Sequence, residues 1–182
     1  MEHVLALPAL EAAPQVLGMR LVYDSPQGRM AGIIVEVEAY RQDDPASHSF
    51  RPRTPRTEAL FGPPGTVYIY FIYGLHYCIN IVLGNAQALL IRAVEPTEGI
   101  EFMQRRRDQQ DIKKLCNGPA KLVQAFGIPK TVNGTTFFTG PVRLEEGRRI
   151  PANQIVAGPR IGISKATDKH WRFYAKESPF VS

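Results

Sequence analysis

Residues 32–39 read Gly-Ile-Ile-Val-Glu-Val-Glu-Ala, a β-branched run that predicts a strand. Residues two apart on a strand share a face, so Glu36 and Glu38 are expected on one face and Val35 and Val37 on the other. A carboxylate is costly to bury in an apolar strand unless a partner compensates its charge. Partial burial also makes it a better base near neutral pH. This strand is therefore a candidate site of acid–base chemistry, and a simply solvated face is the alternative.

Outward from this strand, the chain alternates between predicted strands, helices and one long connection. Residues 41–65 are rich in Pro, Gly and Asp, which predicts an ordered, irregular connection, and one this long is uncommon without a function. The other predicted elements are a helix over 7–17 broken at Pro14, strands over 66–73, 77–83 and 88–94 with Pro96 closing the last, a helix over 97–107, a helix over 117–126 with Asn117 as cap, Pro119 in its first turn and Gly127 at its end, and strands over 160–164 and 171–175.

Length and composition predict one domain over residues 1–182, because 182 residues with 44% hydrophobic content suffice for one sizeable core. No stretch approaches the roughly 20 apolar residues of a membrane span, and residues 1–17 lack a basic leader, so we expect a cytoplasmic protein, nucleoid-associated if the cell is prokaryotic. Cys78 and Cys116 have no paired spacing and are expected to be buried thiols.

The charge of the chain is unevenly distributed. Residues 1–50 hold three Lys or Arg against seven Asp or Glu, whereas residues 51–182 hold 19 against ten. This division fits a protein that places carboxylate chemistry beside a polyanion, although many basic proteins bind nothing anionic. The basic runs at 51–56, 105–107 and 113–114, and Lys121 in the helix after Pro119, contact either phosphates or solvent.

Tyrosines are concentrated in residues 68–77, which contain four of the seven in the chain. Aromatic rings stack on nucleic-acid bases, and a ring beside a glycine turn can act as a wedge in a duplex. A core strand is the alternative, since Tyr is a good strand former. Two further polar residues, Asn80 and Arg92, interrupt apolar strands and need partners. Arg92 could pair with Glu38 or Glu95, and spacing does not decide between them.

Six motifs in order resemble the alkyladenine (3-methyladenine) DNA glycosylase family from about residue 7 to the C-terminus. The resemblance implies a mixed α/β (α+β) domain with a curved, mainly antiparallel sheet flanked by helices. The motifs are Val-Glu-Val-Glu-Ala-Tyr at 35–40 with His48-Ser49 beyond it, Thr54-Pro55-Arg56, the tyrosine segment 68–77 running into Cys78-Ile79-Asn80, Leu-Ile-Arg-Ala-Val-Glu-Pro at 90–96, Asn-Gly-Pro-Ala-Lys-Leu at 117–122, and Arg-Ile-Gly-Ile at 160–163 before Arg172-Phe173-Tyr174 and Ser178-Pro179.

The resemblance also implies roles at the reaction centre. Glu38 is the general base that deprotonates a water, and that water attacks the anomeric carbon. Arg92 and the main-chain carbonyl of Ile161 hold the water. No role is implied for Glu36. At Thr57-Glu58 the sequence departs from the family pattern, which commonly has an asparagine and a basic or polar residue there, and this weakens the contacts assigned to that loop.

A second set of implied roles concerns the DNA. The rings of Tyr40, His48 and Tyr70 sandwich a flipped base, and Asn80 guards the pocket against the guanine amino group. A base must leave the stack before an enzyme can reach its glycosidic bond, and the gap needs a filler, which is Tyr73 beside Gly74. Further DNA contacts are assigned to Thr54, Arg56, Leu75, His76 and Lys121.

The expected protein is thus a monomeric, monofunctional glycosylase that acts on damaged purines in double-stranded DNA without cofactor, metal or membrane. Family substrates are alkylated adenine and guanine and, in many members, hypoxanthine or etheno-adenine. Cationic alkylated bases suit a tyrosine pocket. One alternative is a non-catalytic nucleic-acid-binding module with the same fold. A glycoside hydrolase using Glu36 and Glu38 as its carboxylate pair fails on geometry, since such groups must flank a bond.

Overall fold

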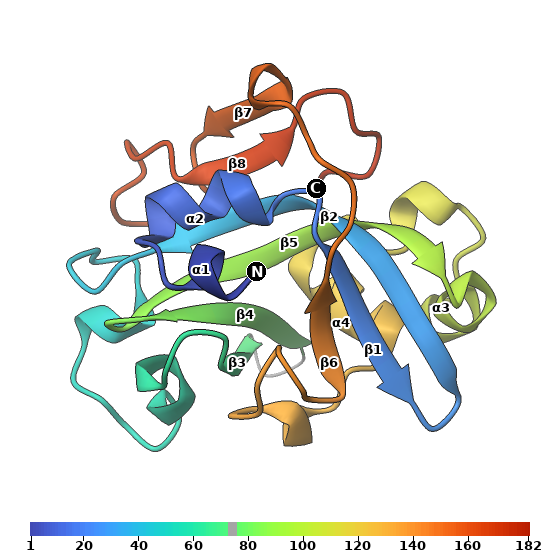
Figure 1. Cartoon of the computed structure of the whole chain (residues 1–182), viewed down its shortest axis with the longest axis horizontal. Coiled ribbons are helices and arrows are strands. Elements are labelled where there is room, and N and C mark those ends of the chain that lie inside the picture. Colours follow the sequence, from blue (N-terminus) through green and yellow to red (C-terminus); the bar gives the residue numbers. More distant parts are fainter. Residues whose placement is uncertain (73–75) are drawn as a thin grey trace.

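The strand expected around residues 32–39 is longer than predicted and lies at the centre of the sheet. In this computed structural model, which describes residues 1–72 and 76–182, β2 spans Gly28–Tyr40. Residues 31–40 of β2 pair on one edge with β5 (Gln87–Glu98). On the other edge β1 (Arg20–Ser25) pairs with residues 28–33 and β8 (Arg172–Ala175) with residues 36–38. β2 thus pairs with one strand from near the N-terminus, β1, and one from near the C-terminus, β8 (Figure 1).

The described part of the sheet is antiparallel at every pairing, which confirms the predicted mixed α/β class. The strand order is β3-β4-β5-β2-β1-β6, with β8 beside β2 and β7 beside β8. Figure 1 shows α2 lying over β2 with α1 beside it, and α2 also contacts β5 while α1 contacts β4. The remaining bounds are β3 (Val67–Ile72), β4 (His76–Gly84), β6 (Val142–Glu145), β7 (Ile155–Gly158), α1 (Glu2–Leu5), α2 (Ala9–Val16), α3 (Ile100–Arg107) and α4 (Pro119–Phe126).

Two prolines were expected to end elements, and both are accommodated inside them. Pro14 lies within α2 near its C-terminal end, where only one intrahelical donor is lost before the helix stops at Val16. Pro96 lies within β5 opposite Gly32, beside a register shift and beyond residues 87–90, which are the part of β5 that pairs with β4. Proline is tolerated where no ladder donor is required.

Two further predictions need correction. The cap of α4 is Gly118 and not Asn117, whose side chain instead accepts a hydrogen bond from Lys121. Gly127 ends that helix in the left-handed conformation, as predicted. Residues 160–164 form no strand, because β8 takes β7 as its partner and leaves them as a connecting segment. That segment is placed across the end of β2, where it contributes to the site below.

Two bulges interrupt the pairing of β2 with β5 between residues 34 and 37. The register runs from Ile34 opposite Val94 to Glu36 opposite Ala93, and so leaves Val35 unmatched. It then runs from Glu36–Ala93 to Val37–Ile91, and so leaves Arg92 unmatched. Val35 consequently packs in a different hydrophobic cluster from Val37, although the alternation of the sequence predicted that they share a face. Bulges re-aim side chains and are frequent beside active sites.

The core is built mainly from the β-branched and leucine side chains of the central strands with α2, α3 and α4. Cys78 and Cys116 are free and buried, as predicted. Residues 41–65 are an ordered connection with two short 3-10 turns at His48–Phe50 and Glu58–Phe61. Among the described residues, no helix combines the length and apolar character that a membrane crossing requires.

Candidate functional site

Four positions, three of them polar or aromatic, align in one row across the sheet. Glu38 of β2 is opposite Leu90 of β5, Leu90 is opposite Asn80 of β4, and Asn80 is opposite Tyr68 of β3. Facing residues in adjacent strands present their side chains on the same face. The pairing therefore gathers residues from four strands, widely separated in sequence, on one face.

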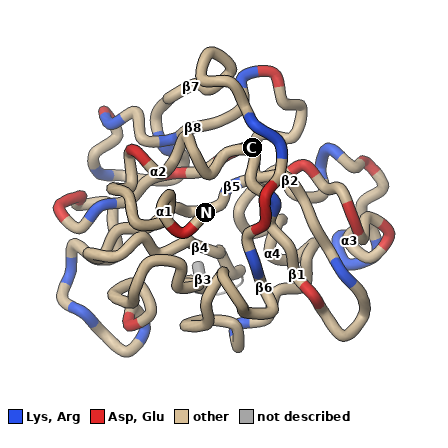
Figure 2. The backbone as a smooth tube through the Cα atoms, in the orientation of Figure 1, with Lys and Arg blue, Asp and Glu red and all other residues tan. Residues whose placement is uncertain are grey.

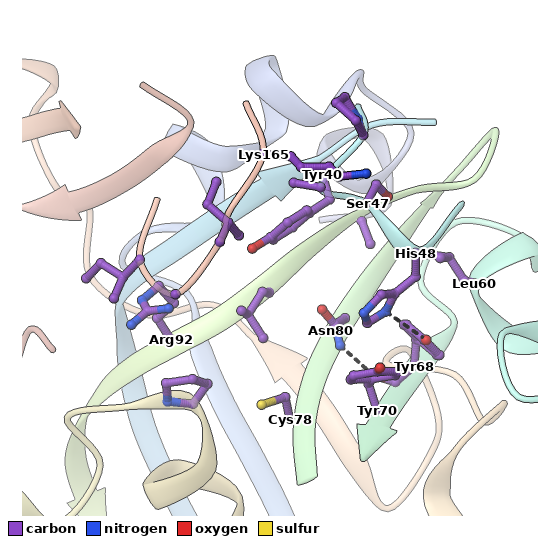
Figure 3. Close-up of a pocket in the computed structure, with 18 of the residues that line it drawn as sticks. Tyr40, Ser47, His48, Leu60, Tyr68, Tyr70, Cys78, Asn80, Arg92 and Lys165 are labelled. Atoms are coloured by element: carbon purple, nitrogen blue, oxygen red, sulfur yellow. Dashed lines mark hydrogen bonds between the residues drawn. The ribbon is translucent and has the colours of Figure 1, made fainter. Parts of the chain in front are cut away.

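A cavity of about 480 Å³ opens over this face. Its walls include Tyr40 at the end of β2, His48 of the 41–65 connection, Tyr70 of β3 and Arg92 of β5. Figure 3 shows Tyr40 on one side of the cavity and His48 with Tyr70 on the other. Residues 161–165 complete the rim. The volume lies within the range of small-molecule sites, which are typically a few hundred Å³ with few polar groups.

Glu38 lies beside this cavity with its side chain fully buried. Its Oε1 accepts a hydrogen bond from the Ile161 backbone N–H at 2.7 Å and lies 3.2 Å from Nη1 of Arg92. Its Oε2 accepts a hydrogen bond from the Tyr40 hydroxyl at 2.8 Å. Three donors from three segments thus fix the carboxylate, and Oε2, with one donor, keeps a lone pair for another partner.

The bulges place Arg92 beside Glu38, one of its two predicted partners, and also beside Glu36. The guanidinium bridges both glutamates, with Nε donating to Oε1 of Glu36 at 3.1 Å and Nη1 close to Glu38. Glu95 instead forms an ion pair with Arg148. The alternative prediction, that Glu36 and Glu38 lie on a solvent-exposed face, is wrong, since both are fully buried. Ile161 participates through its N–H, and the role of its carbonyl stays a prediction.

The aromatic wall has a defined order. The rings of His48 and Tyr70 pack against each other with centroids 3.7 Å apart and planes inclined by 40°, so no base fits between them. Nδ1 of His48 is 3.1 Å from the hydroxyl of Tyr68, which is buried below. The guanidinium of Arg56 lies 4.7 Å from the centre of the Tyr70 ring. The cavity therefore leaves room for a planar ligand between Tyr40 and the pair formed by His48 and Tyr70.

Burial favours the uncharged forms of His48 and Tyr40. Desolvation, with the nearby Arg56 and Arg51, lowers the pKa of His48 to about 4. Desolvation, reinforced by Glu38, raises the pKa of the Tyr40 hydroxyl well above its usual value. An uncharged imidazole does not repel a cationic ligand, and electron-rich ring faces attract one. The pocket therefore suits flat and electron-poor ligands.

Asn80 and Cys78 occupy the floor of the cavity between the two walls. Nδ2 of Asn80 donates to the main-chain carbonyl of Tyr68 at 3.1 Å, and this bond fixes the amide plane (Figure 3). Cys78 also lines the cavity, and burial raises the pKa of its thiol to about 11. A protonated thiol is a poor nucleophile, so Cys78 acts here as a small apolar surface. Cys78 was predicted from sequence as a buried thiol but not as a pocket residue.

A buried ion pair that the sequence analysis missed supports the pocket from behind. Arg160 pairs with Asp44, and both side chains are fully buried. The guanidinium carbon lies 4.7 Å from the centre of the Tyr40 ring and 5.1 Å from that of Trp171. The pair joins the 41–65 connection, which carries His48, to the residue before Ile161. An arginine in an otherwise apolar Arg-Ile-Gly-Ile run was the available signal.

Some of the residues predicted to contact DNA are exposed, and others make contacts within the protein. His76, at the start of β4, and Lys121, in the first turn of α4, are exposed, while Thr54 forms a turn with Thr57. Arg56 donates to the carbonyl of Phe71 as well as stacking on Tyr70. Figure 2 shows the basic residues spaced along the connection between β2 and β3. The predictions for Tyr73 and Leu75 lie outside the described residues.

Two arginines of the basic run at residues 105–107 form hydrogen bonds within the fold. Arg106 donates to the carbonyls of Ala125 and Phe126 at the end of α4, and Arg107 donates to Leu115 and Gln124. These arginines tie α3 to α4. Residues 1–72 and 76–182 contain no group of three or more His, Cys, Asp or Glu arranged to hold a metal ion.

Comparisons with known proteins relate this chain to one family. The family model of the methylpurine-DNA glycosylases matches residues 3–179. A protein of Rhodopseudomonas palustris (strain ATCC BAA-98 / CGA009) is 48% identical over 175 residues, which are 94% of this chain and 82% of that protein. A protein of Granulibacter bethesdensis is 45% identical over 179 residues, covering 96% of this chain and 83% of its own length. Both carry the provisional name 3-methyladenine DNA glycosylase.

Proposed function

The chain belongs to the methylpurine-DNA glycosylase family, and we propose that it is a monofunctional DNA glycosylase of base excision repair. Its substrates are purines of the 3-methyladenine type in double-stranded DNA, together with hypoxanthine and etheno-adenine. It hydrolyses the N-glycosidic bond with an activated water and leaves an abasic site. The observation that carries this proposal is the buried Glu38 carboxylate, which is held by three donors beside an aromatic cavity.

The damaged nucleotide enters the cavity by rotating out of the duplex, because its glycosidic bond is inaccessible in the stack. Its base stacks between Tyr40 and the pair formed by His48 and Tyr70, whose mutual contact at 3.7 Å supports this arrangement. Tyr73 fills the gap left in the duplex. Thr54, Arg56, Leu75, His76 and Lys121 contact the DNA around the lesion.

Glu38 acts as the general base. A water bound beside its carboxylate transfers a proton to it while the water oxygen forms a bond to C1′ of the sugar. The C1′–N bond breaks at the same time, and its electron pair leaves with the base. Arg92 and the carbonyl of Ile161 orient the water. A cationic alkylated base leaves as a neutral molecule, so little acid catalysis is required.

Asn80 supplies selectivity against undamaged guanine. The amide is fixed by its bond to the carbonyl of Tyr68 and is almost fully buried on the pocket floor. It cannot swing away from a guanine amino group without losing that bond. Adenine-derived lesions and hypoxanthine lack this amino group and avoid the clash.

The proposal is tested by incubating the protein, with chelator present, with duplexes that each carry one alkylated purine, hypoxanthine or etheno-adenine. Alkali then cleaves any abasic site. We expect strand breaks after alkali with at least one lesion, and none with Glu38→Gln, because an amide cannot accept the proton of the water. Removing a general base typically costs about 10²–10⁴-fold in rate. Failure of the wild-type protein across the whole panel would refute the proposal in favour of a non-catalytic binding module.

Omitting the alkali tests whether the enzyme is monofunctional. Lys165 lies on the rim of the cavity, and a lysine amine near C1′ can cleave the strand through an imine. We expect intact strands until alkali is added. Strand breaks without alkali, lost in Lys165→Met, would show that the enzyme also cuts the backbone.

A further inference from the structure

Glu36 has no role in the proposed reaction, yet its carboxylate accepts four hydrogen bonds whereas that of Glu38 accepts two. Its side chain is fully buried. Oε1 accepts hydrogen bonds from Nε of Arg92 at 3.1 Å, Nη1 of Arg172 at 3.0 Å and the hydroxyl of Ser182 at 2.9 Å. Oε2 accepts one from the backbone N–H of Ser182 at 2.6 Å. Burying a charge so deeply is costly, and such a cost is met only by many well-placed donors.

The same contacts fix the orientation of Arg92. Its Nε and Nη2 donate to the hydroxyl of Ser182 at 3.2 and 3.0 Å, in addition to the bond from Nε to Glu36. Its Nη1 then lies 3.2 Å from Oε1 of Glu38. A guanidinium is planar and rigid, so fixing its Nε edge determines where Nη1 points.

We propose that Glu36, together with Ser182, is a positioning element for this reaction, which holds Arg92 in the orientation that Glu38 and its water require. The inference rests on the proposed function. Neither Glu36 nor Ser182 lines the cavity, and Glu36 is linked to Glu38 through Arg92, which does line it. It acts through Arg92, and the segment that ends at Ser182 is thereby coupled to the reaction centre.

Electrostatics gives this arrangement a measurable signature. The titratable and charged groups around Glu38 are Glu36 and Tyr40 of β2, Arg92 of β5, Cys78 of β4, and Arg172 of β8 and Arg160 behind them. In the wild type Arg92 is shared between two carboxylates. Without the charge of Glu36, Arg92 interacts with Glu38 alone and favours its ionised form, which makes Glu38 a weaker base.

The first experiment measures the single-turnover rate of base release against pH for Glu36→Gln, with enzyme in excess over lesion duplex. We expect a fall of roughly 10–100-fold at neutral pH, typical of a misplaced catalytic group. The acid limb of the profile should also move to lower pH, while affinity for the lesion duplex stays within about twofold, since the stacking walls are intact. A purely structural loss would scale all rates by the folded fraction and leave the limb in place.

The second experiment covers the case in which Glu36→Gln does not fold. Ser182→Ala removes the hydroxyl shared by Arg92 and Glu36 but keeps the backbone N–H that binds Glu36, and Ser182 is exposed. We expect a loss of several-fold in single-turnover rate, restored by Ser182→Thr. The matched control is Ser178→Ala, in the same segment. In the part of the chain that the structure describes, the side chain of Ser178 makes one hydrogen bond, which it accepts from the N–H of Phe180.

Wild-type rates in Ser182→Ala would overturn the inference, and so would a slower Glu36→Gln whose acid limb does not move. Equal losses in Ser178→Ala and Ser182→Ala would also refute it, because the effect would then belong to the segment in general. If the wild-type protein releases no base, the proposed function fails instead, so the two failures are distinguishable.

Discussion

The pair formed by Arg160 and Asp44 gives the sharpest quantitative prediction. Arg160 donates to both carboxylate oxygens of Asp44 and, at 3.1 Å, to the carbonyl of Ala39. Arg160→Met leaves Asp44 buried with the backbone N–H of Ala46 as its remaining partner. Breaking a buried ion pair costs about 3–5 kcal/mol. Loss of the contact with the Tyr40 ring adds roughly 1 kcal/mol or more.

This loss is a large share of the total stability, because domains are stable by only about 5–15 kcal/mol. The double variant Asp44→Leu with Arg160→Met removes both charges, and replacing a buried pair by apolar groups is often neutral. We therefore expect the double variant to be more stable than Arg160→Met alone. The coupling energy between the two positions should be about 2 kcal/mol or more.

The assay is urea unfolding followed by tryptophan fluorescence. The chain has a single tryptophan, Trp171, whose ring lies 5.1 Å from the guanidinium carbon of Arg160. Arg41→Ala is the matched control, since Arg41 also lies over Trp171 but pairs with Asp43 at the surface. Exposed pairs contribute at most about 1 kcal/mol. A coupling energy near zero, or equal losses for Arg160→Met and Arg41→Ala, would refute the reasoning.

Three other changes test the pocket. Tyr40→Phe keeps the stacking ring but removes the donor to Glu38, so the single-turnover rate should fall about tenfold at unchanged lesion affinity; weaker binding would contradict this division. His48 has a lowered pKa of about 4, so it stays neutral in the folded protein while the unfolded chain binds a proton below about pH 6.5. The free energy of unfolding should therefore fall as the pH is lowered from 6.5 to 4. In His48→Gln the urea concentration at the unfolding midpoint should depend less on pH over that range. Asn80→Ala should raise release of undamaged guanine, and an unchanged guanine background would count against the guard role.

The strands with strong local signals were predictable from sequence. The β-branched run at 32–39 and the aromatic run that starts at Val67 form strands because their side chains suit a half-buried pleated surface. The four-residue strands Val142–Glu145 and Ile155–Gly158 were not predicted. Each is too short to establish a period, and its conformation is set by partners distant in sequence, such as β1 for Val142–Glu145.

The candidate site was predictable only in part, for a related reason. Glu38, Tyr40, His48, Tyr70, Asn80 and Arg92 were identified through residue type and motif order, and five of them line one cavity with Glu38 beside it. The pairing of Asp44 with Arg160 spans 116 residues. Asp44 sits in an Asp-Asp-Pro turn that local chemistry explains fully, so nothing nearby indicates a distant cation.

The double bulge explains why residues two apart in β2 can share one arginine. In a regular ladder Arg92 would have a direct partner in β2, and its side chain would be confined to one cross-strand position. Val35 and Arg92 are each left unmatched, so Glu36 is opposite Ala93 and Glu38 is opposite Leu90. Arg92 lies in β5 between these two partner residues. The guanidinium therefore reaches both carboxylates. Alternation with period two specifies which face a side chain takes but not where the register slips, and in this protein the slip brings two carboxylates to one arginine beside the cavity.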